Sequence, residues 1–315
     1  MLAVSISWIL DIRPGLLSPG ALQATQVEGT EFPLKLTDAV GETIFLQEPP
    51  QRIVSVTLTT DEILAALVHH SRIAAVTSLA DNPAISNVAN YYPDSVSRIR
   101  GEVEEIIALQ PDLVFISPYT RAETVRLLLN TDIPVVRLTE FNTLADIKQN
   151  LHTVAAVTNT TTAASKLLQQ IDQKLQSVEA KLKNVTYPRV LFYNLNGSSV
   201  GPNTTIDEII HLAGGYNVLR DTGINGSQKI NEELVIGLQP DIVLTSGWAD
   251  ADQLSPAEQL MKRTAWQNVP AVKNNRVYDL KGNWLFAVSQ FSWNGVEQVA
   301  SIIHPELFSN QGTTE

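Results

Sequence analysis

The chain has 315 residues, of which 44% are hydrophobic and 17% charged, a balance typical of a globular protein with one large or two medium cores. Its net charge of −11 argues against nucleic acid and anionic membrane surfaces as main partners. The absence of cysteine excludes thiol catalysis, iron–sulfur clusters and cysteine-ligated zinc.

Residues 1–31 are predicted to be a leader or a disordered N-terminal segment. The run "MLAVSISWIL" is apolar, but Asp11 and Arg13 follow it closely and no basic residue precedes it. An export signal normally has a basic start and a longer apolar stretch, so this one is atypical or incomplete. No later segment reaches the roughly 18 continuous apolar residues of a membrane span.

Residues 32–160 show the alternation of strands and helices that builds a parallel sheet covered on both faces. A hairpin is expected around Val40 and Gly41. Buried strands are expected within 52–60 and at 72–78, 112–117 and 133–138, with helices at 59–67 and 121–130. In the first of these helices, a threonine or Asp61 is expected to provide the N-cap. This part of the chain is therefore predicted to form an N-terminal α/β lobe.

Residues 161–185 are predicted to form one long helix that links two halves of the protein. Apolar side chains recur at helical spacing between lysine, glutamine and glutamate residues. They are Leu167, Leu168, Ile171, Leu175, Val178 and Leu182.

Residues 186–308 repeat the pattern of the first lobe, before a short tail at 309–315. The stretch "EEIIALQPDLVFIS" (104–117) returns as "EELVIGLQPDIVLTS" (232–246), and "TTDEILAAL" (59–67) returns as "TTIDEIIHLA" (204–213). Strands are expected at 189–196, 241–246 and 276–280, with a last helix at 293–303. The predicted fold is α/β, with two Rossmann-like lobes of mainly parallel sheets joined by one long helix.

Five segments together resemble the solute-binding proteins of cobalamin and iron-siderophore ABC importers. They are "TDAVGETIFLQEPPQRIVSV", "VEEIIALQPDLVFIS", "RVLFYNLNG", "IIHLAGGYNV" and "VPAVKNNRVYDL", in this order along the chain. The resemblance implies a periplasmic or otherwise extracytoplasmic monomer that is not an enzyme and carries no cofactor. Such a receptor captures a corrinoid or a ferric siderophore between its lobes and delivers it to an ABC permease dimer with its ATPase.

Loops at the carboxyl ends of parallel strands form the ligand crevice of doubly wound sheets. In the first lobe these loops hold the candidate ligand-binding residues Thr59, Asp81, Tyr119 and Arg121, and in the second lobe Asn196, Trp248, Trp284 and Phe286. The aromatic side chains suit a bulky planar ligand, although each of them could instead pack against its own lobe. Arg121 suits an anionic group, or is a solvated residue in the first turn of a helix.

One motif raises the alternative of an α/β hydrolase. "GSSVG" (197–201) fits G-x-S-x-G with Ser199 as nucleophile, and Asp241 and His304 follow in hydrolase order. The motif requires a sharp strand-to-helix turn, however, and Pro202 and further polar residues precede the next helix. We therefore prefer a receptor.

The histidines argue against a directly bound metal ion. All five are expected on helices or helix ends and none in a crevice loop, so neither a metal nor a histidine-ligated haem is predicted. A tyrosine-ligated haem remains an alternative, since Tyr91 and Tyr92 precede the acidic motif. A ligand sensor with the same fold is a further alternative.

Glu104 and Glu233 are separated by the same 129 residues as the two Pro-Asp pairs. Carboxylates in a first helical turn stabilise the helix dipole by roughly 0.3–1 kcal/mol, which accounts for acidic residues at these positions. The resemblance implies a further role, since in that family one surface glutamate per lobe docks onto the permease. A permease of two like subunits suits a receptor with one carboxylate on each lobe.

Overall fold

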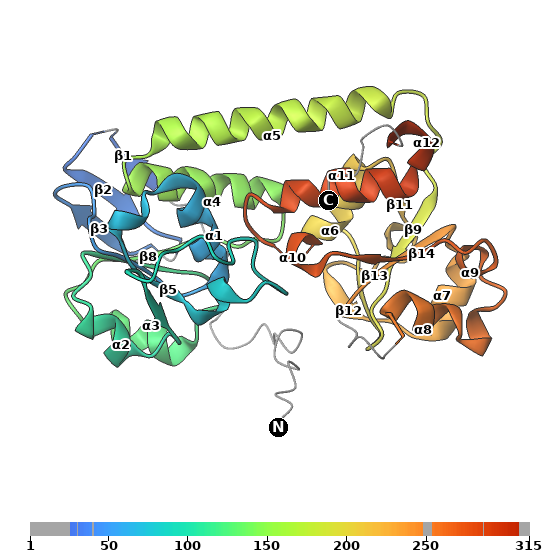
Figure 1. Ribbon diagram of the computed structural model, residues 1–315, viewed down its shortest axis with the longest axis horizontal. Coiled ribbons are helices and arrows are strands. Elements are labelled where there is room, and N and C mark those ends of the chain that lie inside the picture. The colour runs from blue at the N-terminus through green and yellow to red at the C-terminus, as the bar shows by residue number, and fades with distance from the viewer. Residues whose placement is uncertain (1–25, 30, 40, 248–253, 286, 309–315) are drawn as a thin grey trace.

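The computed structural model describes residues 26–29, 31–39, 41–247, 254–285 and 287–308. Two α/β lobes lie side by side beneath one long helix, α5 (Thr161–Lys181), which spans both (Figure 1).

The N-terminal lobe is built on a five-stranded parallel sheet with the strand order β6-β5-β4-β7-β8. Its strands are β4 (Ile53–Ser55), β5 (Ile73–Thr77), β6 (Ser97–Ile99), β7 (Leu113–Ile116) and β8 (Val135–Arg137). Along β7, Leu113 and Phe115 belong to one core cluster, and Val114 and Ile116 belong to another. Side chains alternate between the faces of a strand, so the sheet is buried on both sides.

Helices and a small antiparallel sheet cover this lobe. The helical segments are α1 (Leu58–Leu67), η1 (His70–Arg72), η2 (Ser78–Asp81), α2 (Val103–Ala108), α3 (Ala122–Leu128) and α4 (Leu144–Val157). The small sheet has the order β1-β2-β3, with β1 (Gln26–Glu28), β2 (Leu34–Thr37) and β3 (Thr43–Leu46).

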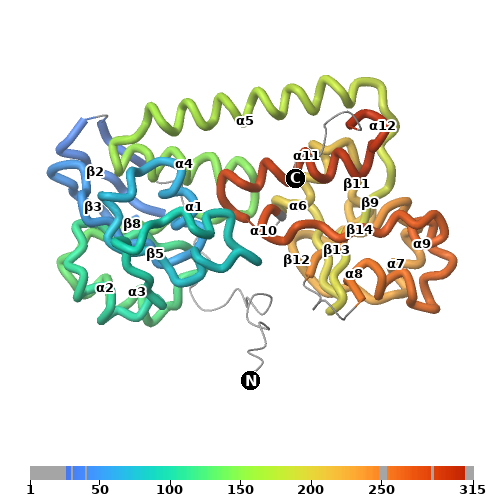
Figure 2. The backbone as a smooth tube through the Cα atoms, in the orientation of Figure 1, coloured from blue at the N-terminus to red at the C-terminus, as the bar shows by residue number. Residues whose placement is uncertain are grey.

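Helix α5 is 21 residues long, which corresponds to about 32 Å. Its apolar stripe explains how it joins the lobes. Ala164, Leu168 and Ile171 pack in the N-lobe core, and Val178 packs in the C-lobe core. Leu175, between them, contacts both cores. Figure 2 shows α4 and α11 beneath α5, one toward each lobe.

The C-terminal lobe has a four-stranded parallel sheet with the order β11-β9-β13-β14. Its strands are β9 (Arg189–Phe192), β11 (Tyr216–Asn217), β13 (Ile242–Ser246) and β14 (Val277–Leu280). An antiparallel ribbon pairs β10 (Ser198–Val200) with β12 (Ser227–Lys229). The helical segments are α6 (Thr205–Leu212), η3 (Val218–Asp221), α7 (Glu232–Leu238), α8 (Pro256–Met261), η4 (Thr264–Trp266), α9 (Pro270–Lys273), α10 (Gly282–Leu285), α11 (Ser292–Ile303) and α12 (Pro305–Phe308).

The predicted fold class is confirmed, and the structure adds details that the sequence pattern missed. Strand β6, the β10–β12 ribbon and the short helix α10 were not predicted. The N-cap of α1 is Thr57, whereas Asp61 is fully buried and does not cap the helix. None of the helices in the described part of the chain has both the length and the apolar character of a membrane span.

Candidate functional site

The carboxyl ends of the N-lobe strands meet where the strand order reverses. β4 is central, with β5 on one side and β7 on the other, so the chain leaves these neighbours in opposite directions. In open α/β sheets the crevice at such a switch point is where ligands bind. The loops after β4, β5, β6 and β7 all reach this place.

A cavity of about 310 Å³ occupies this switch point. It is lined by Val56, Thr57, Leu58, Thr59, Leu79, Arg100, Gly101, Tyr119, Thr120, Arg121 and Thr124. Three of the predicted ligand residues, Thr59, Tyr119 and Arg121, are thereby brought together. The lining has two arginines and several hydroxyls but no carboxylate, on a chain whose net charge is −11. Such a lining suits an anionic or oxygen-rich group of a ligand.

Tyr119 is the aromatic residue among those that line this cavity. Its side chain is 43% exposed, and its ring stacks against Phe141 with the ring centroids 6.2 Å apart. Desolvation of the hydroxyl, with the Glu140 and Asp146 carboxylates as lesser causes, raises the pKa of Tyr119 to about 12. Tyr119 is therefore a neutral phenol at physiological pH, able to donate a hydrogen bond.

The two arginines of the cavity differ in their partners. Arg121 forms an exposed ion pair with Glu102, with 3.1 Å between Nη1 and Oε1. Arg100 donates its main-chain N–H to Glu105 (2.8 Å), while its guanidinium has no partner among the described residues. Arg100 was not predicted as a site residue. It follows β6, so recognising that strand would have revealed it.

Two predicted ligand residues lie outside this cavity and have partners of their own. Asp81 is exposed and forms two hydrogen bonds with the guanidinium of Arg98, at 2.8 and 2.9 Å. Asn196 is exposed in the loop after β9, where its side-chain oxygen accepts the N–H of Ser198 at 2.9 Å.

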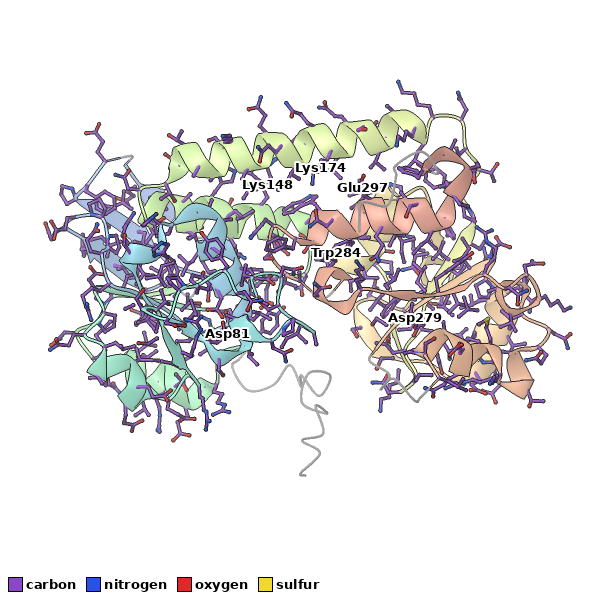
Figure 3. All side chains as sticks on the ribbon, in the orientation of Figure 1. Asp81, Lys148, Lys174, Asp279, Trp284 and Glu297 are labelled. Atoms are coloured by element: carbon purple, nitrogen blue, oxygen red, sulfur yellow. The ribbon has the colours of Figure 1, made fainter. Side chains whose placement is uncertain are left out.

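Trp284 lies in α10, where the two lobes meet (Figure 3). It is half-buried, and the Nζ atom of Lys281 is 4.7 Å from its ring centroid. The remaining predicted aromatic residues, Trp248 and Phe286, lie outside the described residues.

The predicted docking glutamates are exposed in the first turns of α2 and α7. Both helices lie at the end of the molecule opposite α5 (Figure 1). Their neighbours are engaged locally, since Glu105 accepts the Arg100 N–H and Glu232 forms an ion pair with Arg263. Glu104 and Glu233 have no such partner within the described part of the chain.

The geometry gives no support to the hydrolase alternative. Ser199 is fully buried in β10, not on a strand-to-helix turn, and its hydroxyl donates to the Phe192 carbonyl. Asp241 accepts the N–H of Arg189, and His304 contacts the Gly214 carbonyl at 3.0 Å. Each member of the supposed triad therefore has a separate structural partner. Over the described residues, no group of three or more histidine or carboxylate side chains forms a candidate metal site.

Two lobes, a long linking helix and a cavity at a sheet switch point define a bilobal binding protein. The chain belongs to the periplasmic binding protein family, which it matches over residues 53–283.

Individual relatives agree with this assignment. The chain is 23% identical to the uncharacterized ABC transporter substrate-binding lipoprotein YvrC of Bacillus subtilis, covering 91% of this chain and 90% of the relative. It is 28% identical to the vitamin B12-binding protein of Vibrio parahaemolyticus, covering 80% and 89%. The fold is similar to that of the periplasmic heme-binding protein RhuT of Roseiflexus, with a TM-score of 0.68 and 24% identity over 82% of this chain and 99% of RhuT.

Proposed function

We propose that this protein is the extracytoplasmic substrate-binding component of an ABC importer for a corrinoid, which it binds between its lobes. The observation that carries the proposal is the basic, hydroxyl-rich cavity at the N-lobe switch point. Membership of the periplasmic binding protein family supports the transport role. The relatives named for vitamin B12 or cobalamin support a corrinoid as the ligand.

The ligand site combines polar groups with aromatic surfaces. In the N-terminal lobe, Arg100, Tyr119 and Arg121 contact oxygen atoms at the edge of the ligand, with Thr59 beside them. From the other side, Trp284 covers the flat ring system, because an indole supplies a large contact area with few rotatable bonds. We propose further ligand contacts from Asp81 and Asn196, and from Trp248 and Phe286, which lie outside the described residues.

Glu104 and Glu233 dock the receptor onto the permease. Both carboxylates are exposed and unpaired in the described structure, on short helices at the same end of the molecule. Ile107, one helical turn after Glu104, is 44% exposed and adds an apolar contact beside the charge. The charges fix orientation and accelerate encounter more than they raise affinity.

Isothermal titration calorimetry with cyanocobalamin, hemin and ferrichrome tests the ligand. We expect cyanocobalamin to bind one-to-one and the other two compounds to bind at least a hundredfold more weakly. Trp284→Phe is the matched variant and should weaken cyanocobalamin binding. Tight binding of only hemin or only ferrichrome would show that the ligand is a haem or a ferric siderophore and not a corrinoid. Binding of none of the three would reject the proposed ligand site.

A further inference from the structure

A segment of the C-terminal lobe crosses to the N-terminal lobe and returns. After β14 the chain forms α10, and the residues that follow, Val288, Phe291 and Trp293, pack against the N-lobe core. Helix α11 then returns to the C-lobe core through residues such as Val296 and Val299. We call residues 282–285 and 287–290 the strap. The strap is a second link between the lobes besides α5.

A pair of asparagines joins the strap to the N-terminal lobe. The side-chain amide of Asn87 donates to the Asn283 carbonyl at 2.6 Å. In return, Asn283 Nδ2 donates to Asn87 Oδ1 at 3.1 Å. The two residues are 196 positions apart in the sequence. Two reciprocal hydrogen bonds fix both the separation and the orientation of α10 relative to the N-terminal lobe.

The same asparagine is held by a buried carboxylate. Glu62 of α1 is only 2% exposed, and its Oε1 accepts both the N–H and the side-chain amide of Asn87, each at 2.9 Å. Its Oε2 accepts the hydroxyl of Ser289 at 2.5 Å, and its main-chain carbonyl accepts Gln290 Nε2 at 2.6 Å. A buried carboxylate is tolerated where its oxygens are hydrogen-bonded. Asn87 therefore holds the beginning of the strap, through Asn283, and Glu62 holds its end and is bonded to Asn87.

Trp284 lies directly beside this network in the sequence. It follows Asn283 directly, in a helix of four residues. A helix of one turn is not stable by itself, because nucleation fixes several backbone angles for a single hydrogen bond. The hydrogen bonds of Asn283, Ser289 and Gln290 to the N-terminal lobe supply what the helix lacks.

We propose that Asn87 and Glu62 are positioning residues for ligand capture. Their hydrogen bonds to the strap fix the position of Trp284 between the lobes. This inference rests on the proposed function, in which Trp284 covers the ligand. The strap belongs to the C-terminal lobe but bonds to the N-terminal lobe, so separating the lobes strains these bonds.

Fluorescence quenching tests the positioning without any ligand. The emission of Trp284 is obtained as the difference between each protein and its Trp284→Phe counterpart, and acrylamide is the quencher. We expect Asn87→Ala and Asn283→Ala each to raise the quenching constant of Trp284 at least twofold. Asn130→Ala, which changes an exposed N-lobe asparagine without a side-chain hydrogen bond among the described residues, should leave it unchanged. Unchanged quenching in the two network variants would overturn the proposal.

Affinity for cyanocobalamin gives the second readout. Loss of the Asn87 bonds should weaken binding about tenfold. The double variant Asn87→Ala with Asn283→Ala should be little worse than Asn87→Ala alone, since Asn87→Ala already removes the bond that Asn283→Ala removes. Fully additive losses, or equal affinity in a folded Asn87→Ala protein, would overturn the proposal. Ser289→Ala removes one bond to Glu62 and a weaker one from the Phe291 N–H at 3.3 Å, and it replaces the asparagine variants if they do not fold.

The two proposals fail in different ways. If the unaltered protein binds none of the three probes, the proposed ligand is wrong, and the quenching experiment still decides whether Asn87 positions Trp284. The other case is that the unaltered protein binds cyanocobalamin, and Asn87→Ala and Asn283→Ala have the same affinity and the same Trp284 quenching constant as the unaltered protein. The proposed function then stands and this inference fails.

Discussion

Asp112 accepts the main-chain N–H of Arg52 at 2.9 Å, and the Arg52 guanidinium donates to the carbonyls of Leu109 and Gln110 at the end of α2. The C-terminal lobe repeats this arrangement: Asp241, 129 residues after Asp112, accepts the N–H of Arg189 at 2.9 Å. The Arg189 guanidinium likewise donates to the Leu238 carbonyl at the end of α7.

This arrangement explains the duplicated Leu-Gln-Pro-Asp motif. In each lobe an arginine at the beginning of a strand satisfies carbonyls at a helix C-terminus, where a cation is also favoured by the helix dipole. The glutamine before each proline takes left-handed backbone angles, with φ of 47° at Gln110 and 48° at Gln239. Each motif thus ends an acidic helix abruptly and joins it to the sheet, which holds Glu104 and Glu233 in comparable places.

Asp112→Ala tests this anchoring. The main-chain N–H groups of Gln51 and Arg52 lose their acceptor, so we expect a loss of about 1–3 kcal/mol in the free energy of unfolding. Urea unfolding followed by circular dichroism measures it. Asp132→Ala, at an exposed aspartate without a partner in the described structure, should change stability by less than about 0.5 kcal/mol. Equal effects of the two variants would contradict the role of the motif.

Reversing the docking charges tests the permease contact. Glu104→Lys combined with Glu233→Lys should weaken binding to the permease–ATPase complex in proteoliposomes about a hundredfold, because each site exchanges attraction for repulsion. Ligand affinity in solution should stay unchanged. Glu123→Lys, at an exposed residue of α3, makes a charge reversal of the same sign and should leave the complex largely intact. Loss of ligand affinity in the double variant would place these residues in the ligand site instead.

Arg100→Gln tests the charge of the N-lobe cavity. Cyanocobalamin carries a phosphodiester in its nucleotide loop, and dicyanocobinamide lacks that loop. If Arg100 binds the phosphate, the variant should bind cyanocobalamin about tenfold more weakly, as expected for a charge-assisted hydrogen bond. Its affinity for dicyanocobinamide should not change. An equal loss of affinity for both compounds would show that Arg100 does not bind the phosphate.

The overall architecture could be predicted from the sequence because it depends on local patterns. The stripe from Leu168 to Val178 recurs at helical spacing, and the buried strands are short runs of branched apolar residues. Strand β6 lacks such a run, since its three residues are Ser97, Arg98 and Ile99. Pairing with β5 makes it a strand, and such pairing leaves little mark on the local sequence. Arg100 was overlooked for the same reason.

The placement of Trp284 could not be predicted for a different reason. The sequence indicated a tryptophan in a loop after a C-lobe strand, and it gave no sign that Asn87 of the other lobe holds that loop. Contacts between residues so far apart in the chain depend on how the lobes pack, which short-range patterns do not encode. Glu62 is similar, because an acidic residue near a helix start normally faces solvent, whereas here the strap covers it.

The buried Asp61 predicts an unusual dependence of stability on pH. Desolvation raises its pKa from 3.8 to about 7, partly offset by hydrogen bonds from Ser55 and Thr77. Between these two values the unfolded chain has released the proton and the folded protein has kept it. Unfolding therefore becomes easier as pH rises, by up to about 1.4 kcal/mol per pH unit, and this contribution ends above about pH 7. The pKa of Glu62, also raised mainly by burial, contributes in the same direction.

Asp61→Asn removes the titrating group while keeping an acceptor for Thr77, whose N–H and hydroxyl both donate to Asp61. Between pH 5 and pH 7 the free energy of unfolding falls in the unaltered protein, and in the variant we expect it to fall by about 2–3 kcal/mol less. It should also be the more stable of the two at pH 8. Urea unfolding at the three pH values measures both differences, with Asp132→Asn as the exposed control. Parallel pH profiles for the variant and the unaltered protein would mean that Asp61 is ionised in the folded state. The hydrogen bonds from Ser55 and Thr77 would then stabilise the charge of Asp61 more than burial disfavours it.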